Sequence, residues 1–348
     1  MTTGQRGTGG TPDGSGDADP DRRGFTTWPL RVRAAVAVTG VAAVLAGAGA
    51  FLANNLSNAF GPDSVCGGAV SADALTAALG SGRVGEHTYG NGQLRNGTAF
   101  CVATVSRGIF GSDRSVTVEL RENTGLSALT DDSAARLFAA SANGGAAGAA
   151  SDHRAWALLP EGCGNGLRVT VSSGGDDGRG ARNLAEFSVT VANRIAGQRT
   201  CGSTPMPAPH VLSEAGADHD LNLDAVCGLP GFTLPDLPGN HGLREMATTA
   251  TDPLWACRIH TDANPGPSAS LTIGTEPRLL TSTAPKDEPG LGRARWVGAD
   301  EMVTSCQGKP TVFRLSWDGA QKLIPNGDET WKQFLVAGGK AIGCEPIL

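Results

Sequence analysis

Eight cysteines are the residues of this 348-residue chain whose type and spacing indicate chemistry most clearly. They form two sets of four, with intervals of 35, 62 and 38 residues in the first set and 30, 49 and 38 in the second. Cysteines paired at a repeated spacing are typical of disulfides, which persist outside the reducing cytoplasm. We expect all eight to be disulfide-bonded: Cys66, Cys101, Cys163 and Cys201, then Cys227, Cys257, Cys306 and Cys344.

Four cysteines in one set allow three pairings, and the sequence excludes none of them. We favour first with second and third with fourth, because the last interval is the same in both sets while the middle one differs by 13 residues. Closing loops of this size stabilises a domain by about 3 to 4 kcal/mol in the chain-entropy model. Zinc is disfavoured, because the chain contains no CxxC pair.

Histidines and acidic residues are the other side chains that could do chemistry. His210, His219 and Asp220 lie in a Pro-rich connector, where they could meet at a metal, although such residues more often face solvent. The other histidines form no HExxH or similar metal-ligand pair: His87, His153, His241 and His260. We therefore predict no metal site.

Nucleophilic, acid–base and phosphate-binding chemistry leaves no signature in the sequence. There is no GxSxG elbow, and the glycine-rich stretches at 143–150 and 173–180 lack the lysine of a phosphate-binding loop. Candidate carboxylates for a glycosidase pair require a spatial separation that the sequence does not give: Glu161, Asp176, Asp177, Asp300 and Glu301. A Ser, His and Asp set from separate loops stays open. We predict no catalytic residue and no cofactor.

Residues 34–53 form an uncharged run of 20 residues, which as a helix can cross a hydrocarbon core of about 30 Å. Shortly before it stand Arg22, Arg23, Arg31 and Arg33. The next basic residue is Arg83, so the positive-inside rule predicts a cytoplasmic N-terminus and an external C-terminal part. A signal peptide cleaved after Ala50 and a twin-arginine export signal are alternatives, and both also place the remainder outside the cytoplasm.

Charge and composition differ between the N-terminal end and the rest of the chain. Residues 1–33 are rich in Gly, Thr, Asp and Pro, which predicts a disordered tail. The net charge is −6 overall and −7 after residue 33. An acidic bulk without clustered Arg and Lys excludes a nucleic-acid backbone as the main partner.

The two cysteine sets lie in similar local sequences. Three pairs of segments keep the same order: AFCVATV (99–105) with WACRIHT (255–261), SVTVEL (115–120) with SASLTI (268–273), and RAW (154–156) with RARW (293–296). We interpret this order as a tandem duplication in which the loops have different lengths.

Each copy predicts the same succession of elements. A short helix is expected over 71–80, with Ser71 as its N-cap, whereas the prolines at 228–239 make the second copy irregular there. Strands are expected at 115–120 and in equivalent runs after the third cysteine, LRVTV (167–171) and TVFRLSW (311–317). A terminal helix follows in each copy, on these apolar residues: Leu184, Phe187, Val191 and Ile195, and Trp331, Phe334, Leu335 and Ile342.

Cys344 is expected to fasten the last helix to the strand that follows Cys306. Five tryptophans could line a carbohydrate-binding face, but their places in the repeated elements favour core packing: Trp156, Trp255, Trp296, Trp317 and Trp331.

The apolar segment, the duplicated cysteines and the WAC (255–257) and RARW (293–296) contexts resemble exported, cysteine-paired domains of unknown function from actinobacterial envelope proteins. The resemblance covers residues 62–348, implies compact α+β domains and carries over no functional residue. No lipobox cysteine follows the apolar segment, so the sequence does not support a lipid anchor.

We predict an α+β protein with two tandem, internally duplicated domains, each with an antiparallel sheet and a C-terminal helix. The expected order is a disordered cytoplasmic tail (1–33), a transmembrane helix (34–53), an extracytoplasmic domain (62–204), a Pro-rich connector (205–221) and a second extracytoplasmic domain (222–348). The predicted role is a membrane-anchored, noncatalytic binding or accessory protein of the bacterial cell envelope, with an unknown protein or cell-wall component as partner. An exported hydrolase acting on an envelope substrate and a structural envelope spacer are the alternatives.

Overall fold

The computed structural model describes the chain from residue 29 to residue 348 outside a set of short segments. These segments are 90–99, 109–110, 123–135, 140–144, 165–166, 175–179, 203, 215, 237–241, 250–253, 262–263, 280–291, 299, 318–325 and 345. Most of the predicted tail at 1–33 therefore lies outside the described residues. The chain divides into two compact units, Met1–Leu52 and Ala53–Leu348.

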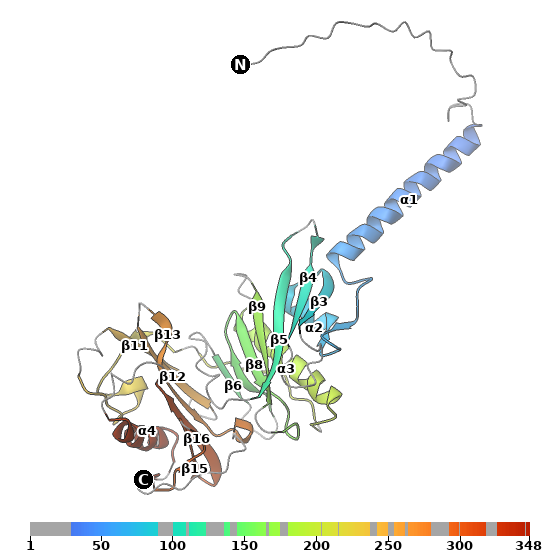
Figure 1. The fold of residues 1–348 in the computed structure, drawn as a ribbon. Helices are drawn as coiled ribbons and strands as arrows, with labels where there is room; N and C mark the ends of the chain where they lie inside the picture. The colour runs from blue at the N-terminus through green and yellow to red at the C-terminus, as the bar shows by residue number, and fades with distance from the viewer. Residues whose placement is uncertain are drawn as a thin grey trace, which may run out of the picture. The chain divides into compact units, whose positions relative to one another are not determined.

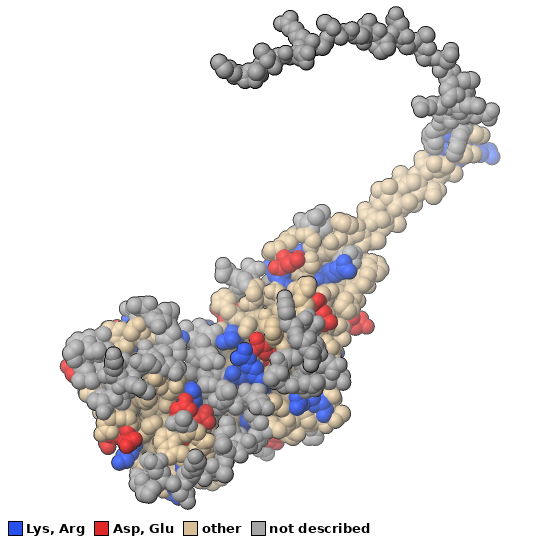
Figure 2. Space-filling model, in the orientation of Figure 1, with Lys and Arg blue, Asp and Glu red and all other residues tan. Residues whose placement is uncertain are grey.

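The first element, α1 (Leu30–Leu56), is an apolar helix. Its stretch from Leu30 to Ala53 is long and apolar enough to cross a membrane, and none of it is buried. Figure 2 shows a continuous tan surface along this helix, with basic side chains only at its N-terminal end. A membrane span and a signal sequence both have this length and composition.

The predicted α+β fold is confirmed, because the described residues form two seven-stranded antiparallel sheets with helices (Figure 1). In spatial order the first sheet consists of β3 (Arg83–Tyr89), β4 (Phe100–Ser106), β5 (Arg114–Glu122), β9 (Leu167–Gly174), β8 (Arg154–Leu158), β7 (Ala147–Ala150) and β6 (Arg136–Ala139). The second consists of β10 (His219–Asp220), β11 (Leu243–Ala247), β12 (Leu254–Thr261), β13 (Asn264–Gly274), β16 (Lys309–Ser316), β15 (Glu301–Cys306) and β14 (Arg295–Trp296).

The remaining elements are short strands and helices around these sheets. They are the two-stranded pair β1 (Ser64–Val65) and β2 (Val70–Ser71), the helices α2 (Ala72–Leu79), α3 (Ala181–Gln198) and α4 (Gly327–Ala341), and the 3₁₀ turns η5 (Val226–Gly228) and η7 (Pro277–Leu279). As predicted, Ser71 caps α2 by accepting a hydrogen bond from the Ala74 N–H. The equivalent Pro-rich segment of the second copy forms no α-helix in its described part, 228–236.

The duplication is visible in the hydrogen-bond register of both sheets. The strand order β3-β4-β5-β9-β8-β7 recurs as β11-β12-β13-β16-β15-β14. Cys101 lies opposite Val118, and Val118 lies opposite Val171. The second sheet repeats this row with Cys257, Leu271 and Leu315. The alignments of AFCVATV with WACRIHT and of SVTVEL with SASLTI are thereby confirmed. The domain limits 62–204 and 222–348 stay predictions.

One predicted alignment is wrong. RAW (154–156) belongs to β8, which corresponds to β15, whereas RARW (293–296) ends in β14, which corresponds to β7. Trp156 lies opposite Thr170, and the residue in its place is Glu301, which lies opposite Arg314. The number of residues between the second and third cysteines differs between the copies. The matching sequences RAW and RARW therefore lie on strands that are not equivalent in the two sheets.

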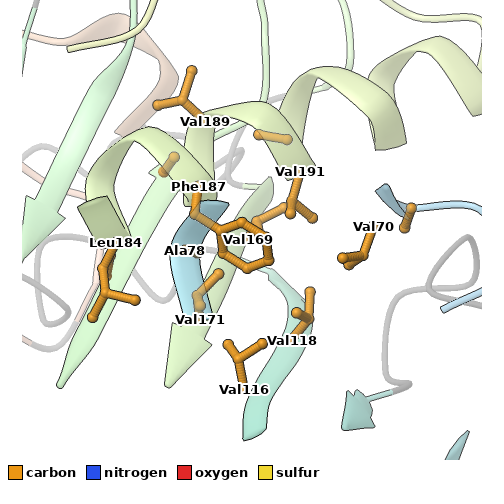
Figure 3. Close-up of a cluster of buried hydrophobic side chains, with 14 of the residues drawn as sticks. Val70, Ala78, Val116, Val118, Val169, Val171, Leu184, Phe187, Val189 and Val191 are labelled. Carbon is orange, nitrogen blue, oxygen red and sulfur yellow. The ribbon is translucent and has the colours of Figure 1, made fainter. Parts of the chain in front are cut away.

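The first sheet packs one face against α2 and α3. Figure 3 shows Val116, Val118, Val169 and Val171 from the central strands directed toward Leu184, Phe187 and Val191 of α3. Alternate strand residues point to the same face, so the pattern read from the sequence forms this core. Each fully buried Val, Leu or Phe contributes about 1.5 to 3 kcal/mol relative to exposure.

The second sheet packs against α4 through aromatic rings. Phe334 is fully buried, and its ring centroid lies 5.7 Å from that of Phe313, 5.8 Å from Phe232 and 6.0 Å from Trp331. Such tilted and edge-to-face contacts are favoured for aromatic pairs. Phe334 occupies the place that Val191 takes in the first copy, ten residues before the last cysteine.

The favoured disulfide pairing is confirmed by four bonds: Cys66–Cys101, Cys163–Cys201, Cys227–Cys257 and Cys306–Cys344. The first bond of each copy joins the segment before the first of the six repeated strands to the second of these strands. The second bond joins a hairpin between two strands to the end of the terminal helix. Cys344 therefore fastens α4 beside β16, as expected.

The helix-free faces of the two sheets meet in a third apolar cluster. Its members are Leu137, Ala147, Ala149, Trp156 and Leu158 from the first copy and Leu254, Ala256, Leu279 and Val312 from the second. Beside this cluster the buried Arg278 forms a bidentate ion pair with Glu276. The same guanidinium donates to the carbonyls of Leu159 at 3.1 Å and Gly145 at 2.7 Å, which belong to the first copy.

Removing the Cys306–Cys344 bond should destabilise the second copy. The double variant Cys306→Ala, Cys344→Ala opens a 38-residue loop, and we expect the free energy of unfolding to fall by about 4 kcal/mol. Denaturant titration followed by circular dichroism measures the change. The pair Cys163→Ala, Cys201→Ala opens a loop of the same length and should give a similar loss. Wild-type stability in either variant would contradict the stabilising role of these bonds.

Arg278 should hold the two copies together. Arg278→Met removes the bonds to Leu159 and Gly145 and leaves the Glu276 carboxylate buried without its partner, so we expect a loss of about 3 kcal/mol in denaturant titration. The control Arg121→Met alters an ion pair whose arginine is largely exposed, and it should cost less than about 1 kcal/mol. Equal losses in the two variants would contradict the role of Arg278 in holding the two copies together.

Candidate functional site

Charged side chains gather at the corner where β10 and β11 meet β12. The register places Asp220 opposite Arg244, and Arg244 opposite His260. These residues, together with Asp218 and His219, are called the corner cluster below. They combine two carboxylates, two imidazoles and a guanidinium, which is a chemically versatile set at a sheet edge.

Arg244 is the centre of the corner cluster. Its Nε lies 3.0 Å from Asp218 Oδ1, its Nη1 lies 3.1 Å from Asp220 Oδ1, and its Nη2 donates to the Asp218 carbonyl at 3.0 Å. His260 Nε2 lies 3.5 Å from the other Asp218 oxygen. Asp218 is thus shared between a guanidinium and an imidazole.

The corner cluster has an exposed rim above a buried base. The Asp220 side chain is 93% exposed and His219 54% exposed, whereas His260 is only 8% exposed. His260 Nδ1, the ring nitrogen that does not face Asp218, is buried and has no hydrogen-bond partner in the described part of the chain. A nucleophilic triad would require a hydroxyl that hydrogen-bonds to this nitrogen. None of the described residues provides one. The rim remains able to form ion pairs with a partner.

Glu245 lies on the core side of the same strand and serves the fold. Its Oε2 accepts a hydrogen bond from the Cys227 N–H at 2.6 Å, and its Oε1 lies 3.7 Å from His219 Nδ1. Burial raises the pKa of the Glu245 carboxyl, although the Cys227 N–H and the His219 charge lower it. Burial is the dominant cause, so ionising this group costs stability.

The first copy repeats this contact. Glu86 accepts a hydrogen bond from the Cys66 N–H, and it occupies the position in β3 that Glu245 occupies in β11. Cys66 and Cys227 both have positive φ, 58° and 59°, a conformation that is uncommon outside glycine. A carboxylate on the strained amide in both copies indicates a structural role for this pair, separate from the corner cluster.

A second polar group lies on the helix-free face of the second sheet. Buried polar residues on its strands are Arg258, Ser270, Thr272, Glu301 and Ser316. Arg314 lies 2.7 Å from Asp300 Oδ2 and 3.7 Å from Glu301 Oε1. The acids Asp300 and Glu301, candidates for a catalytic pair, thus have Arg314 as a common partner.

The structure brings some sequence candidates together and separates others. His219 and Asp220 are adjacent in β10, whereas His210 lies apart and accepts a hydrogen bond from Arg182 at its carbonyl. Glu161 is exposed in the turn after β8. Asp176, Asp177 and His241 lie outside the described residues. Core packing is confirmed for the three buried tryptophans, Trp156, Trp255 and Trp331, and Trp296 and Trp317 lie partly buried against the second core.

Sequence reasoning missed Asp218, Arg244 and Glu245 as members of one region. They are isolated charges in a connector and a short strand, and only strand pairing brings them together. Within the described residues one group has metal-ligand geometry, formed by Cys66, Glu86 and Cys101. Its two sulfurs are bonded to each other, so they cannot act as thiolate ligands.

Comparisons with known proteins do not identify a relative. No protein-family model matches the chain, and no curated protein matches its sequence. A solved structure, the di-domain ARO/CYC StfQ from the steffimycin biosynthetic pathway, has 12% sequence identity and a TM-score of 0.14, with 75% of this chain and 89% of that chain covered. At this TM-score the similarity supports no conclusion about fold or function.

Glu245→Gln should change how stability depends on pH. The unfolded carboxyl ionises near its ordinary pKa of 4.5, below the raised pKa of the folded state, so the contribution of Glu245 to the free energy of unfolding falls as pH rises through this range. Gln keeps a carbonyl acceptor for Cys227 but cannot ionise. We expect the stability of the variant relative to wild type to increase from pH 4 to pH 7 in urea titrations. A difference that stays constant or decreases would contradict this ionisation cost.

Proposed function

We propose that the chain is a membrane-anchored, extracytoplasmic binding or accessory protein of a bacterial cell envelope. The observation that supports this most strongly is the combination of an apolar, unburied helix with four disulfides in the part that follows it. Disulfides persist in oxidising compartments, and Arg31 and Arg33 at the start of α1 favour a cytoplasmic N-terminus. The helix is retained as an anchor in this proposal.

The proposed binding surface is the rim of the corner cluster. β10 is a two-residue edge strand, and exposed sheet edges offer unpaired backbone groups to a partner strand or peptide. Asp220 is almost fully exposed while Arg244 holds it in place. A protein or a peptide-bearing cell-wall component with a basic group matches this chemistry, because it can pair with the strand edge and with the carboxylate together.

A noncatalytic role agrees with the way the acidic groups are used. Asp218 pairs with Arg244 and His260, and Asp300 and Glu301 pair with Arg314. Glu245 is bound to the Cys227 amide. Each of these carboxylates already has a structural partner, so the proposal assigns none of them to catalysis.

Site-specific photo-crosslinking in intact cells tests the proposal. The full-length chain carries a photoreactive amino acid in place of Asp220, or in place of Arg121 on the first sheet as a matched exposed control. We expect a defined adduct from position 220 that is absent from position 121. The change Arg244→Gln should reduce the adduct, because it releases the rim from its ion pairs.

Two outcomes would contradict the binding role. Equal labelling at both positions, or no labelling at position 220, would contradict the proposed binding surface and favour an envelope spacer. A turnover of envelope material that His260→Ala abolishes while circular dichroism stays unchanged would favour the hydrolase. Alkaline extraction and protease digestion of intact cells separately test the anchor and the external location.

A further inference from the structure

The short segment from the end of α1 at Leu56 to Pro62, called the junction below, is hydrogen-bonded to the first sheet. After α1 ends at Leu56, the Asn58 side chain accepts from the Val84 N–H at 3.0 Å and donates to the Pro62 carbonyl at 2.8 Å. The Gly61 N–H donates to the Asn58 carbonyl at 3.1 Å. These bonds attach the residues that follow α1 to β3.

Large apolar side chains on this junction are exposed. Phe60 is 70% exposed, and Leu56 at the end of α1 is 46% exposed. Leu56 follows Ala53, the end of the membrane-length stretch, by three residues, a helical rise of about 4.5 Å. The headgroup layer is about 5 to 8 Å thick on each side of a bilayer, so Leu56 falls within it when the stretch spans the membrane. Exposed aromatic rings favour that layer.

Arginines from the strand ends lie near the same junction. Arg83 is exposed and directly precedes Val84, which binds Asn58. Arg107 donates to the Ser81 carbonyl at 3.2 Å, and Gly108 next to it lies directly against the Asn55 side chain of α1. Exposed acidic residues also lie in the neighbouring segments, among them Asp63, Glu86 and Asp113, and Asp113 accepts a hydrogen bond from the Ser106 hydroxyl. Basic side chains and an exposed aromatic ring next to the end of a membrane-length helix are typical of a surface that contacts anionic lipid headgroups.

We propose that this junction is a second membrane contact, in which Phe60 enters the boundary between headgroups and acyl chains and Arg83 and Arg107 pair with lipid phosphates. This inference rests on the proposed function, because it requires α1 to span the bilayer. The occupant of the surface is an anionic phospholipid bilayer. The first copy is thereby held at the membrane by side-chain contacts as well as by the helix.

Depth-dependent fluorescence quenching tests the contact. The full-length variant Phe60→Cys, purified without reductant and labelled with an NBD fluorophore, is placed in nanodiscs of phosphatidylcholine and phosphatidylglycerol. The matched control is Val211→Cys, whose side chain is 77% exposed in the connector. We expect emission from position 60 to shift to shorter wavelength and to be quenched by a spin label near the headgroup, while position 211 behaves as in water. Water-like emission at position 60 would overturn the inference.

A second measurement avoids the added thiol. Hydrogen–deuterium exchange of the wild-type chain compares nanodiscs containing phosphatidylglycerol with nanodiscs of phosphatidylcholine alone. Slower exchange around Phe60 and Arg83 in the anionic discs is expected, and Arg83→Gln with Arg107→Gln should remove the difference. The same exchange in both discs would overturn the pairing with lipid phosphate. Flotation of the wild type with vesicles separates the proposals: a chain that does not float refutes the anchor and this contact together, whereas a floating chain with a water-like position 60 refutes the contact alone.

Discussion

Each copy depends on the disulfide that joins the segment before its first repeated strand to its second repeated strand. In the first copy Cys66 bonds to Cys101, and in the second Cys227 bonds to Cys257. The first cysteine of each pair adopts a positive φ that costs energy in a residue with a side chain. A glutamate on the neighbouring strand accepts the N–H of that cysteine in both copies. The covalent bond and the hydrogen bond together fix the start of the fold against the sheet.

With both ends of each copy fastened, the helix-free faces of the sheets can differ. Trp156 of the first copy, which packs against the second sheet, is replaced at the equivalent position by Glu301. Thr170 is replaced in the same way by Arg314. The core-side residues at equivalent positions stay apolar, such as Val171 and Leu315. The helix-free face thus differs between the copies, with Glu301 and Arg314 in the second where the first has Trp156 and Thr170, while the core face stays apolar.

The sequence predicted the features that depend on local pattern. The Ser71 cap, the alternation in the central strands and the equal final cysteine intervals each have a direct physical cause in neighbouring residues, and each led to a correct element or bond. The corner cluster could not be predicted, because it requires β10 to pair with β11 across a long irregular segment. The wrong alignment of RAW with RARW has the same cause, because similar sequences do not show which strands pair with each other.

The pattern of covalent bonds in the intact protein tests this account most directly. Proteolysis without reduction, followed by mass spectrometry of the linked peptides, identifies every cysteine pair. The account predicts four linkages, each confined to one copy: Cys66–Cys101, Cys163–Cys201, Cys227–Cys257 and Cys306–Cys344. A linkage between cysteines of different copies, or cysteines recovered as free thiols, would contradict it.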